Sequence, residues 1–335
     1  MKRPSLSVLK GNVDGSIVEG TFTFANGHEV PLYRIESSNA LNQLIGKAKF
    51  INESYGNVYY RGVDGLYDNA LPKLMRPTSR KTKLSTKLTK LNKVLNSVIN
   101  DDLLSKSLQL ERFIAKHSFS SPSETRRAKR LQKYCVEALL QHYSGTTTFL
   151  DVVDNHWVAL WMGLQKFIAL GEGKKYTKCE TRELNAYDLF EKAGFIYDLL
   201  KSGKTIDEDI FIYILLLGMP YPETLLENGI IETEQFVEVD LRRALPSFFL
   251  RPHAQHALVI KRREVFIKTE TDSDMASQVL AVLKIRIDKA NEWLGKGGLL
   301  TQNNLFPSPS VDHGYHTLLK REDLFSNTFE IQRYY

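Results

Sequence analysis

The chain has 335 residues, of which 42% are hydrophobic and 25% charged, a composition typical of a globular protein with a sizeable core. Its two cysteines, Cys135 and Cys179, are too few for a disulfide framework and favour a reducing compartment, so we expect a cytoplasmic protein. The first residues lack the apolar run of a signal peptide, and the most apolar stretch, residues 211–219, is too short to cross a bilayer. We therefore expect no membrane association. Gly-rich phosphate loops, zinc-ligand spacings and metalloprotease motifs are also absent from the sequence, which predicts no metal site.

The formal net charge of +6 is concentrated in two places. Residues 73–93 contain eight Lys and Arg and no Asp or Glu, and residues 126–133 contain five more basic side chains. Each cluster alone is typical of a solvated helix face. Two clusters that flank one segment favour a polyanionic partner such as nucleic acid. The side chains that we expect to contact it are Lys81, Lys83, Arg126 and Arg130.

The beginning of the chain alternates between polar and apolar residues, as β-strands do. Two such runs, residues 16–24 and 28–35, flank an Asn26-Gly27 pair, which predicts a β-hairpin. A short helix is expected at about 39–50. We divide the chain into a hairpin extension with this short helix (1–45), a main domain (46–322) with a basic helical insert at about 76–130, and a tail (323–335).

Strands and helices then follow in an irregular order, which predicts an α+β fold. The segment 156–170 is apolar on nearly every face and should be a helix in the centre of the core. Asp154, just before it, is the expected N-cap. The predicted strands lie at 58–63, 145–153, 211–217, 236–241, 256–262 and 264–269, and the predicted helices at 84–116, 123–142, 156–170, 181–201 and 274–294.

Four separated segments resemble the FRG domain, a family named for its Phe-Arg-Gly motif. They are Tyr60-Arg61-Gly62 with the following LPKLMR, the run LQHY at 140–143 with TTFLD at 147–151, RPHAQHAL at 251–258, and NLFPS at 304–308. Their order and spacing match the family pattern over about residues 55–320. Tyr60 replaces the Phe of the motif, Thr148 replaces a usual Arg, and Ala257 replaces a usual Gly.

The same order of segments also resembles the ADP-ribosyltransferase superfamily. The resemblance implies a mixed or antiparallel split sheet surrounded by helices, with NAD as the substrate that supplies ADP-ribose. Arg61, Asp151 and Gln255 would then be the catalytic residues, and we expect all three around one cleft. The positions that the resemblance implies for NAD binding are Tyr60, Arg61, Gly62, His142, Thr147, Arg251 and Gln255.

The residue types suit this chemistry. The planar guanidinium of Arg61 can bind phosphate oxygens in a bidentate manner, although an arginine in a salt bridge would look the same in sequence. Asp151 follows an apolar run, so its carboxylate must be paired or serve a ligand. Gln255 can contact a ribose hydroxyl but cannot act as a base. A base would have to be Asp151, Glu264 or a group on the substrate.

Three functions of different classes remain open. The favoured one is a toxin or defence effector that transfers ADP-ribose from NAD to a macromolecule, with RNA as the preferred acceptor and a protein inhibitor or antitoxin as a further partner. The second is a non-catalytic RNA-binding module. The third is a nuclease-like toxin that works without NAD. Turnover of NAD separates the first from the other two.

Overall fold

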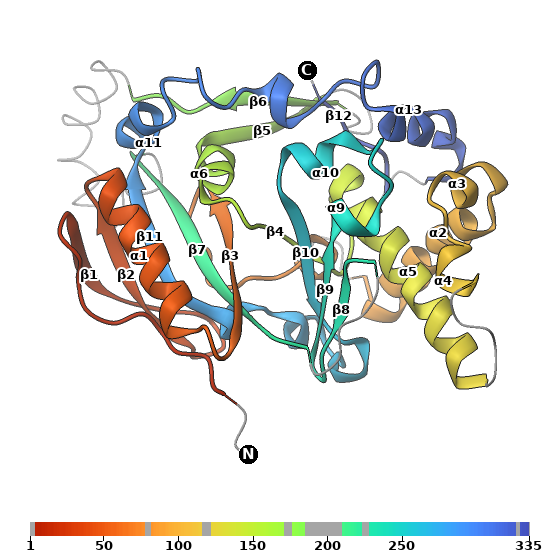
Figure 1. Cartoon of the computed structure of the whole chain (residues 1–335), viewed down its shortest axis with the longest axis horizontal. Helices are drawn as coiled ribbons and strands as arrows, with labels where there is room; N and C mark the ends of the chain where they lie inside the picture. Colours follow the sequence, from red (N-terminus) through yellow and green to blue (C-terminus); the bar gives the residue numbers. More distant parts are fainter. Residues whose placement is uncertain are drawn as a thin grey trace.

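The computed structural model describes residues 4–77, 82–115, 122–170, 176–184, 210–222, 228–325 and 329–334. Within these residues the chain is α+β, as predicted, and is built on one large mixed sheet (Figure 1). In spatial order its strands are β1 (Ser16–Thr23), β2 (Glu29–Ile35), β11 (Val279–Arg286), β7 (Phe211–Pro220), β3 (Gly56–Val63), β4 (Leu150–Val153), β10 (Ala257–Arg262), β9 (Phe236–Asp240) and β8 (Ile230–Glu232).

The middle of this sheet is its weakest junction. Strands β3 and β4 are joined at the single residue pair Tyr60 and Val153, whereas β3 and β7 pair along eight residues. Strands β2 and β11 run parallel, and the other neighbouring strands are antiparallel. Beyond this single pair, no further pairing joins β3 to β4 among the described residues.

Some helices pack on the sheet, and others form a group beside one of its ends. Helix α1 packs on β2 and β3, and α6 packs on β3 and β7. Helices α2 to α5 form a separate layer beside β8 and β9, at the right-hand side of Figure 1. The longer helices are α1 (Ser38–Ile51), α2 (Leu84–Asn100), α5 (Pro122–Ser144), α6 (His156–Leu164) and α13 (His313–Lys320); the short ones are α3 (Asp102–Ser107), α4 (Arg112–Ala115), α9 (Leu241–Ala244), α10 (Leu250–Ala254), α11 (Ile287–Trp293) and α12 (Gln302–Leu305).

Strand β7 shows how the core is divided. Its residues Ile212, Ile214 and Leu216 belong to the apolar cluster with α1 and α6, whereas Tyr213, Leu215 and Leu217 belong to a cluster on the other face. Both sets are buried, so this strand is apolar without interruption. Such a run is typical of a strand covered on both faces.

The N-terminal hairpin is part of the main sheet. Strand β2 pairs in parallel with β11 from Leu32 to Ile35, so β1 and β2 form one end of the sheet. At the other end of the chain, the segment 329–334 returns to a second, three-stranded sheet of β12 (Arg333–Tyr334), β6 (Tyr176–Thr181) and β5 (Gln165–Leu170). Among the described residues, no helix combines the length and the apolar character needed to cross a membrane.

Two predicted helices are wrong in part. The segment predicted as a helix at 156–170 is a helix only to Leu164 and continues as β5, which pairs with β6. The segment predicted as a helix at 274–294 contains β11, which lies between β2 and β7, followed by the short α11. Strand β11 is buried, and a continuous apolar run does not distinguish a buried strand from a buried helix. Strand β5 is mostly exposed, and its strand form goes with its pairing to β6, a partner that the local pattern does not reveal.

Two further predicted elements differ from the structure. The predicted strand at 264–269 is instead a short 3-10 helix at Glu264–Phe266 followed by irregular chain. The predicted helix at 181–201 begins at the last residue of β6, its residues 182–184 have no regular structure, and the remainder lies outside the described residues.

Candidate functional site

A pocket of about 680 Å³ lies where β3 and β4 separate. This volume is within the range of about 300–1,000 Å³ that small-molecule sites in proteins occupy. All three residues predicted to be catalytic, Arg61, Asp151 and Gln255, line the pocket. The expectation that they share one cavity is therefore met, and their roles in it stay predictions.

Arg61 and Asp151 are adjacent in the pocket but do not form a salt bridge of the usual kind. The Nη1 atom of Arg61 donates a hydrogen bond of 2.6 Å to the backbone carbonyl of Asp151, not to its carboxylate. Both side chains are half-buried. Burial raises the pKa of Asp151, although the nearby Arg61 guanidinium counteracts part of this rise. Asp151 is therefore a carboxylate that the protein solvates poorly.

A second arginine, Arg76, lines the same pocket. Burial is the main cause that lowers the pKa of Arg61. The negative charge of Asp151 raises this pKa in part, and the positive charge of Arg76 lowers it further. The Nε of Arg76 donates to the carbonyl of Leu71 at 3.2 Å, and neither arginine forms an ion pair with any described residue. Three carboxylates, those of Asp64, Asp68 and Asp151, also line the pocket, but none of them is within ion-pair distance of Arg61 or Arg76. Two guanidinium groups without such a partner are suited to a polyanionic ligand.

A glutamine holds the Asp151 carboxylate in place. The Nε2 of Gln141, on α5, donates to Asp151 Oδ2 at 2.5 Å, and its Oε1 accepts a hydrogen bond of 2.7 Å from Thr147. Gln141 lines the pocket, whereas Thr147 is fully buried and does not. Thr147 therefore positions Gln141, and the prediction that Thr147 contacts the cofactor does not agree with its place in the structure.

Gln255 presents only part of its amide to the pocket. The side-chain Nε2 donates to the carbonyl of Leu305 at 2.7 Å, which fixes the amide, and the residue is 6% exposed. The Oε1 atom accepts no hydrogen bond from the described residues. It can therefore accept a hydrogen bond from a ligand, and the predicted contact with a ribose hydroxyl stays a prediction.

Tyr60 and Gly62 lie on the other side of β3 from Arg61, and both line the pocket. Tyr60 is fully buried, and its hydroxyl group has no hydrogen-bond partner among the described residues. Gly62 has a packing role, because a Cβ atom there would come within 1.7 Å of the Ala159 carbonyl oxygen on α6. The glycine therefore lets helix α6 approach the strand that carries Arg61.

His142 contributes a neutral imidazole to the pocket. Burial, and then the positive charge of Arg251, lower the pKa of His142 well below its ordinary value. Its Nε2 atom is buried and has no hydrogen-bond partner in the described part of the chain. Buried polar atoms without a partner are rare in proteins, and a ligand in the pocket would provide one.

Arg251 does not line the pocket, contrary to its predicted role in cofactor binding. It is 1% exposed, and its guanidinium carbon lies 4.5–5.2 Å from the ring centroids of four aromatic residues. These rings are Tyr143, Phe306, Tyr315 and Tyr334. The Nη1 atom donates to the backbone carbonyl of His142 at 3.1 Å. A planar, weakly hydrated guanidinium can be buried in this way between aromatic faces.

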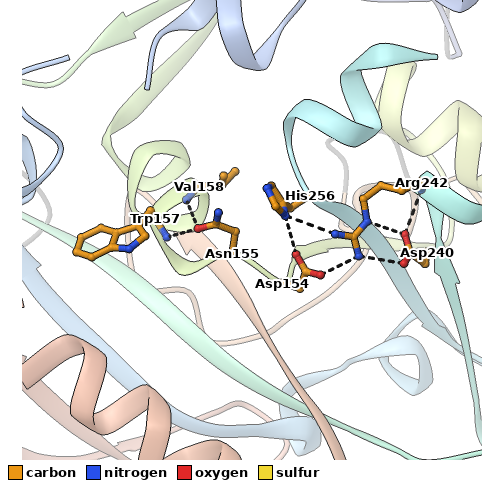
Figure 2. A network of polar contacts seen from close by, with 7 residues as sticks. All are labelled: Asp154, Asn155, Trp157, Val158, Asp240, Arg242 and His256. Atoms are coloured by element: carbon orange, nitrogen blue, oxygen red, sulfur yellow. Dashed lines mark hydrogen bonds and ion pairs between the residues drawn. The ribbon is translucent and has the colours of Figure 1, made fainter. Parts of the chain in front are cut away.

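Asp154 is not the N-cap of α6, as Figure 2 shows. The neighbouring Asn155 is the cap, and its Oδ1 accepts hydrogen bonds from the backbone of Trp157 and Val158. Asp154 instead points away from the helix (Figure 2), where its carboxylate accepts from Arg242 at 2.7 Å and lies 3.1 Å from His256 Nδ1. Arg242 also binds Asp240, so this network joins the ends of β4 and β9 to the turn before β10.

The residues predicted to bind nucleic acid differ in exposure and in whether their charge is paired. Lys83 and Arg126 are exposed, and the Nε of Arg126 donates to the carbonyl of Pro122 at 3.3 Å. Arg130 forms an ion pair of 2.9 Å with Glu232, so its charge is already neutralised in part. Lys81 lies outside the described residues. No group of three or more His, Cys, Asp or Glu side chains that could hold a metal ion occurs in the described ranges.

Comparison with known proteins finds no relative of this chain. No family model, no curated protein and no solved structure matches it. The resemblance to the FRG domain and to ADP-ribosyltransferases therefore rests on the motifs in the sequence alone.

Several pocket residues were not predicted as site residues. Arg76 and Gln141 belong to the quoted motifs LPKLMR and LQHY, so the motifs themselves could have indicated them. Phe306 belongs to the motif NLFPS and also lines the pocket. Tyr334 is in no motif, and its place in the pocket wall depends on the return of the segment 329–334 to β6.

Proposed function

We propose that the pocket binds NAD and that the protein transfers ADP-ribose from NAD to a macromolecule, with RNA as the preferred acceptor. The observation that carries the proposal is the pair Arg61 and Arg76, two guanidinium groups in one pocket without an ion-pair partner in the described residues, beside the half-buried Asp151. A pyrophosphate carries the negative charge and the oxygen spacing that such a pair recognises.

The same pocket offers a group for each chemical need of the reaction. The bond between nicotinamide and ribose C1′ breaks with its electron pair leaving on nicotinamide, so positive charge develops on the ribose. In this proposal Asp151 stabilises that charge, since a poorly solvated carboxylate interacts strongly with a nearby cation. Gln255 offers its Oε1 to a ribose hydroxyl. A nucleophile of the acceptor then bonds to C1′ and loses its proton.

We propose that Glu264 is not the base. Its carboxylate lies 3.1 Å from the buried Lys261, and the residue is not part of the pocket wall. We therefore assign the removal of the proton to Asp151 or to a group of the acceptor. A toxin or defence effector regulated by a protein inhibitor remains our proposal for the biological role.

Incubation of the purified protein with adenylate-labelled NAD and a cell extract tests this function. We expect a labelled macromolecule that loses its label on digestion with nuclease and keeps it with protease. Label that is lost only with protease would replace RNA by a protein acceptor. RNA shortening without NAD would instead select the nuclease-like toxin, and RNA binding without label or cleavage would select the binding module.

A further inference from the structure

Two aromatic rings stand side by side in the wall of the pocket. The rings of Phe306 and Tyr334 have centroids 4.3 Å apart with an interplanar angle of 34°, and both residues line the pocket. Phe306 follows α12, whereas Tyr334 is held in β12 through pairing with β6. We refer to Phe306 and Tyr334 as the aromatic platform.

The aromatic platform is braced from behind by the buried Arg251. Its guanidinium carbon is 4.7 Å from the Tyr334 ring centroid and 5.2 Å from that of Phe306. The Nε and Nη2 atoms of Arg251 have no hydrogen-bond partner among the described residues, so the cation rests mainly on the aromatic faces. Stacking of this kind constrains the rings, because each rotation away from the cation loses a favourable contact.

Neighbouring chain fixes the platform further. Gln332, two residues before Tyr334, donates its backbone N–H to the carbonyl of Tyr143 at 2.8 Å and accepts a hydrogen bond from the Tyr315 hydroxyl at 2.6 Å. Outside the pair, the ring of Phe167 on β5 lies 6.0 Å from Phe306 and 6.4 Å from Tyr334. These contacts hold the two rings in place while both still line the pocket, and Phe167, Phe306 and Tyr334 come from three separate parts of the chain.

The platform lies close to the carboxylate at the centre of the pocket. Burial raises the pKa of Tyr334, and the negative charge of Asp151 adds to the rise while Arg251 opposes it. A flat group resting on these rings would therefore lie in the same pocket as Asp151, Arg61 and Arg76.

We infer that Phe306 and Tyr334 stack the planar heteroaromatic ring of the dinucleotide, with Arg251 as a positioning residue behind them. The inference rests on the proposed function, since it assumes that a ligand with both phosphates and a flat ring enters this pocket. Aromatic side chains that are rigid and partly exposed bind such rings through their faces, whichever ring it is. NAD carries two such rings, nicotinamide and adenine, and the experiment below distinguishes them.

Binding of three probes to the full chain tests the aromatic platform. The probes are inorganic pyrophosphate, which has no ring, ADP-ribose, which has adenine only, and nicotinamide mononucleotide, which has nicotinamide only. The variants are Phe306→Leu and Tyr334→Leu, which keep apolar volume without a ring, and Tyr334→Phe, which keeps the ring. Phe50→Leu on α1 is the control, because Phe50 is 76% exposed and does not line the pocket.

We expect each leucine variant to bind at least one ring-bearing probe about 10- to 100-fold more weakly, the range of stacking on an aromatic ring, while pyrophosphate binding stays within about twofold. Tyr334→Phe should keep most of the affinity. A loss for nicotinamide mononucleotide alone identifies the nicotinamide ring, a loss for ADP-ribose alone identifies adenine, and a loss for both means that the platform accepts either ring.

Unchanged affinity for both ring-bearing probes, or an equal loss for pyrophosphate, would overturn the stacking role and leave the proposed function standing. A wild-type protein that binds none of the three probes would refute the proposed function, and the platform with it.

Discussion

Arg61 donates a hydrogen bond of 2.6 Å to the backbone carbonyl of Asp151, across 90 positions of sequence. Because the bond goes to the carbonyl, the two side chains form no ion pair, although each charge still acts on the pKa of the other group. The Asp151 carboxylate is held instead by Gln141 through one of its oxygens. An anion site can therefore lie beside a carboxylate that stabilises positive charge.

Arg61→Ala should weaken pyrophosphate and NAD binding by about 10- to 100-fold, which corresponds to the loss of hydrogen bonds to a charged group. Arg61→Lys should restore little of it, because an ammonium group lacks the planar fork. Titration calorimetry measures both. Arg286→Ala, in an exposed ion pair with Asp288, is the matched control and should bind as the wild type does. Wild-type affinity in Arg61→Ala with native thermal stability would remove Arg61 from the site.

Asp151→Asn should lower ADP-ribosyl transfer by about 100- to 1,000-fold while the protein stays folded. The folded protein holds the pKa of Asp151 above its unfolded value, so ionisation of this group lowers stability as the pH rises through that window. The variant should consequently unfold at a higher temperature than the wild type at neutral pH. Thermal unfolding and NAD turnover are the measurements, with the exposed Asp14→Asn as control. Full turnover in Asp151→Asn is the outcome that would dismiss Asp151 from catalysis.

Glu238 should make the stability of the protein depend on pH. The carboxyl is 5% exposed and accepts a hydrogen bond from Tyr59, and burial raises its pKa to about 7. Because the folded protein binds this proton more firmly than the unfolded chain does, stability falls between about pH 4.5 and 7, by about 3 kcal/mol at most.

Urea unfolding at a series of pH values measures this effect. Glu238→Gln should flatten the curve in that window, since its amide oxygen still accepts from Tyr59 but does not titrate. Tyr59→Phe should move the loss of stability to higher pH, because the hydrogen bond from Tyr59 lowers the pKa of Glu238. Identical pH curves for Glu238→Gln and the wild type would show that Glu238 does not carry the dependence.

Gly62→Ala should destabilise the protein by about 3 kcal/mol or more, because the added methyl group meets the backbone carbonyl of Ala159 at 1.7 Å and neither backbone can yield easily. Gly46→Ala is the matched control. Gly46 lies inside α1 with no atom within 4 Å of a new Cβ, so the alanine should stabilise the helix by about 0.5–1 kcal/mol. Denaturant unfolding of the two variants provides the comparison, and equal stability would contradict the close packing of α6 on β3.

Neutralising Lys81, Lys83 and Arg126 together should flatten the log–log dependence of RNA binding on salt by about two units, given about 0.7 per single-strand phosphate contact. Adding Arg130→Ala should change the slope little, because Arg130 is paired with Glu232. Binding measured across salt concentrations gives the slope. An unchanged slope in the triple variant would exclude these side chains from RNA binding.

The sequence by itself determined the elements whose patterns are local. The Asn26-Gly27 turn between alternating runs predicted the β1–β2 hairpin, and the apolar runs at 211–217 and 236–241 predicted β7 and β9. Asp151 could be singled out because it follows an apolar run, whereas Arg61 was singled out through the resemblance of Tyr60-Arg61-Gly62 to a family motif. A buried polar side chain needs a partner or a ligand wherever the chain folds.

Only the tertiary structure decided the identity of β11 and the composition of the pocket. Residues 279–285 are buried on both faces between β2 and β7, and burial on both faces removes the alternation that distinguishes a strand from a helix. The pocket brings together residues that are up to 274 positions apart, from Tyr60 to Tyr334, and it leaves Arg251 behind the wall. Such neighbours follow from strand order and from the return of distant segments, which no local pattern encodes.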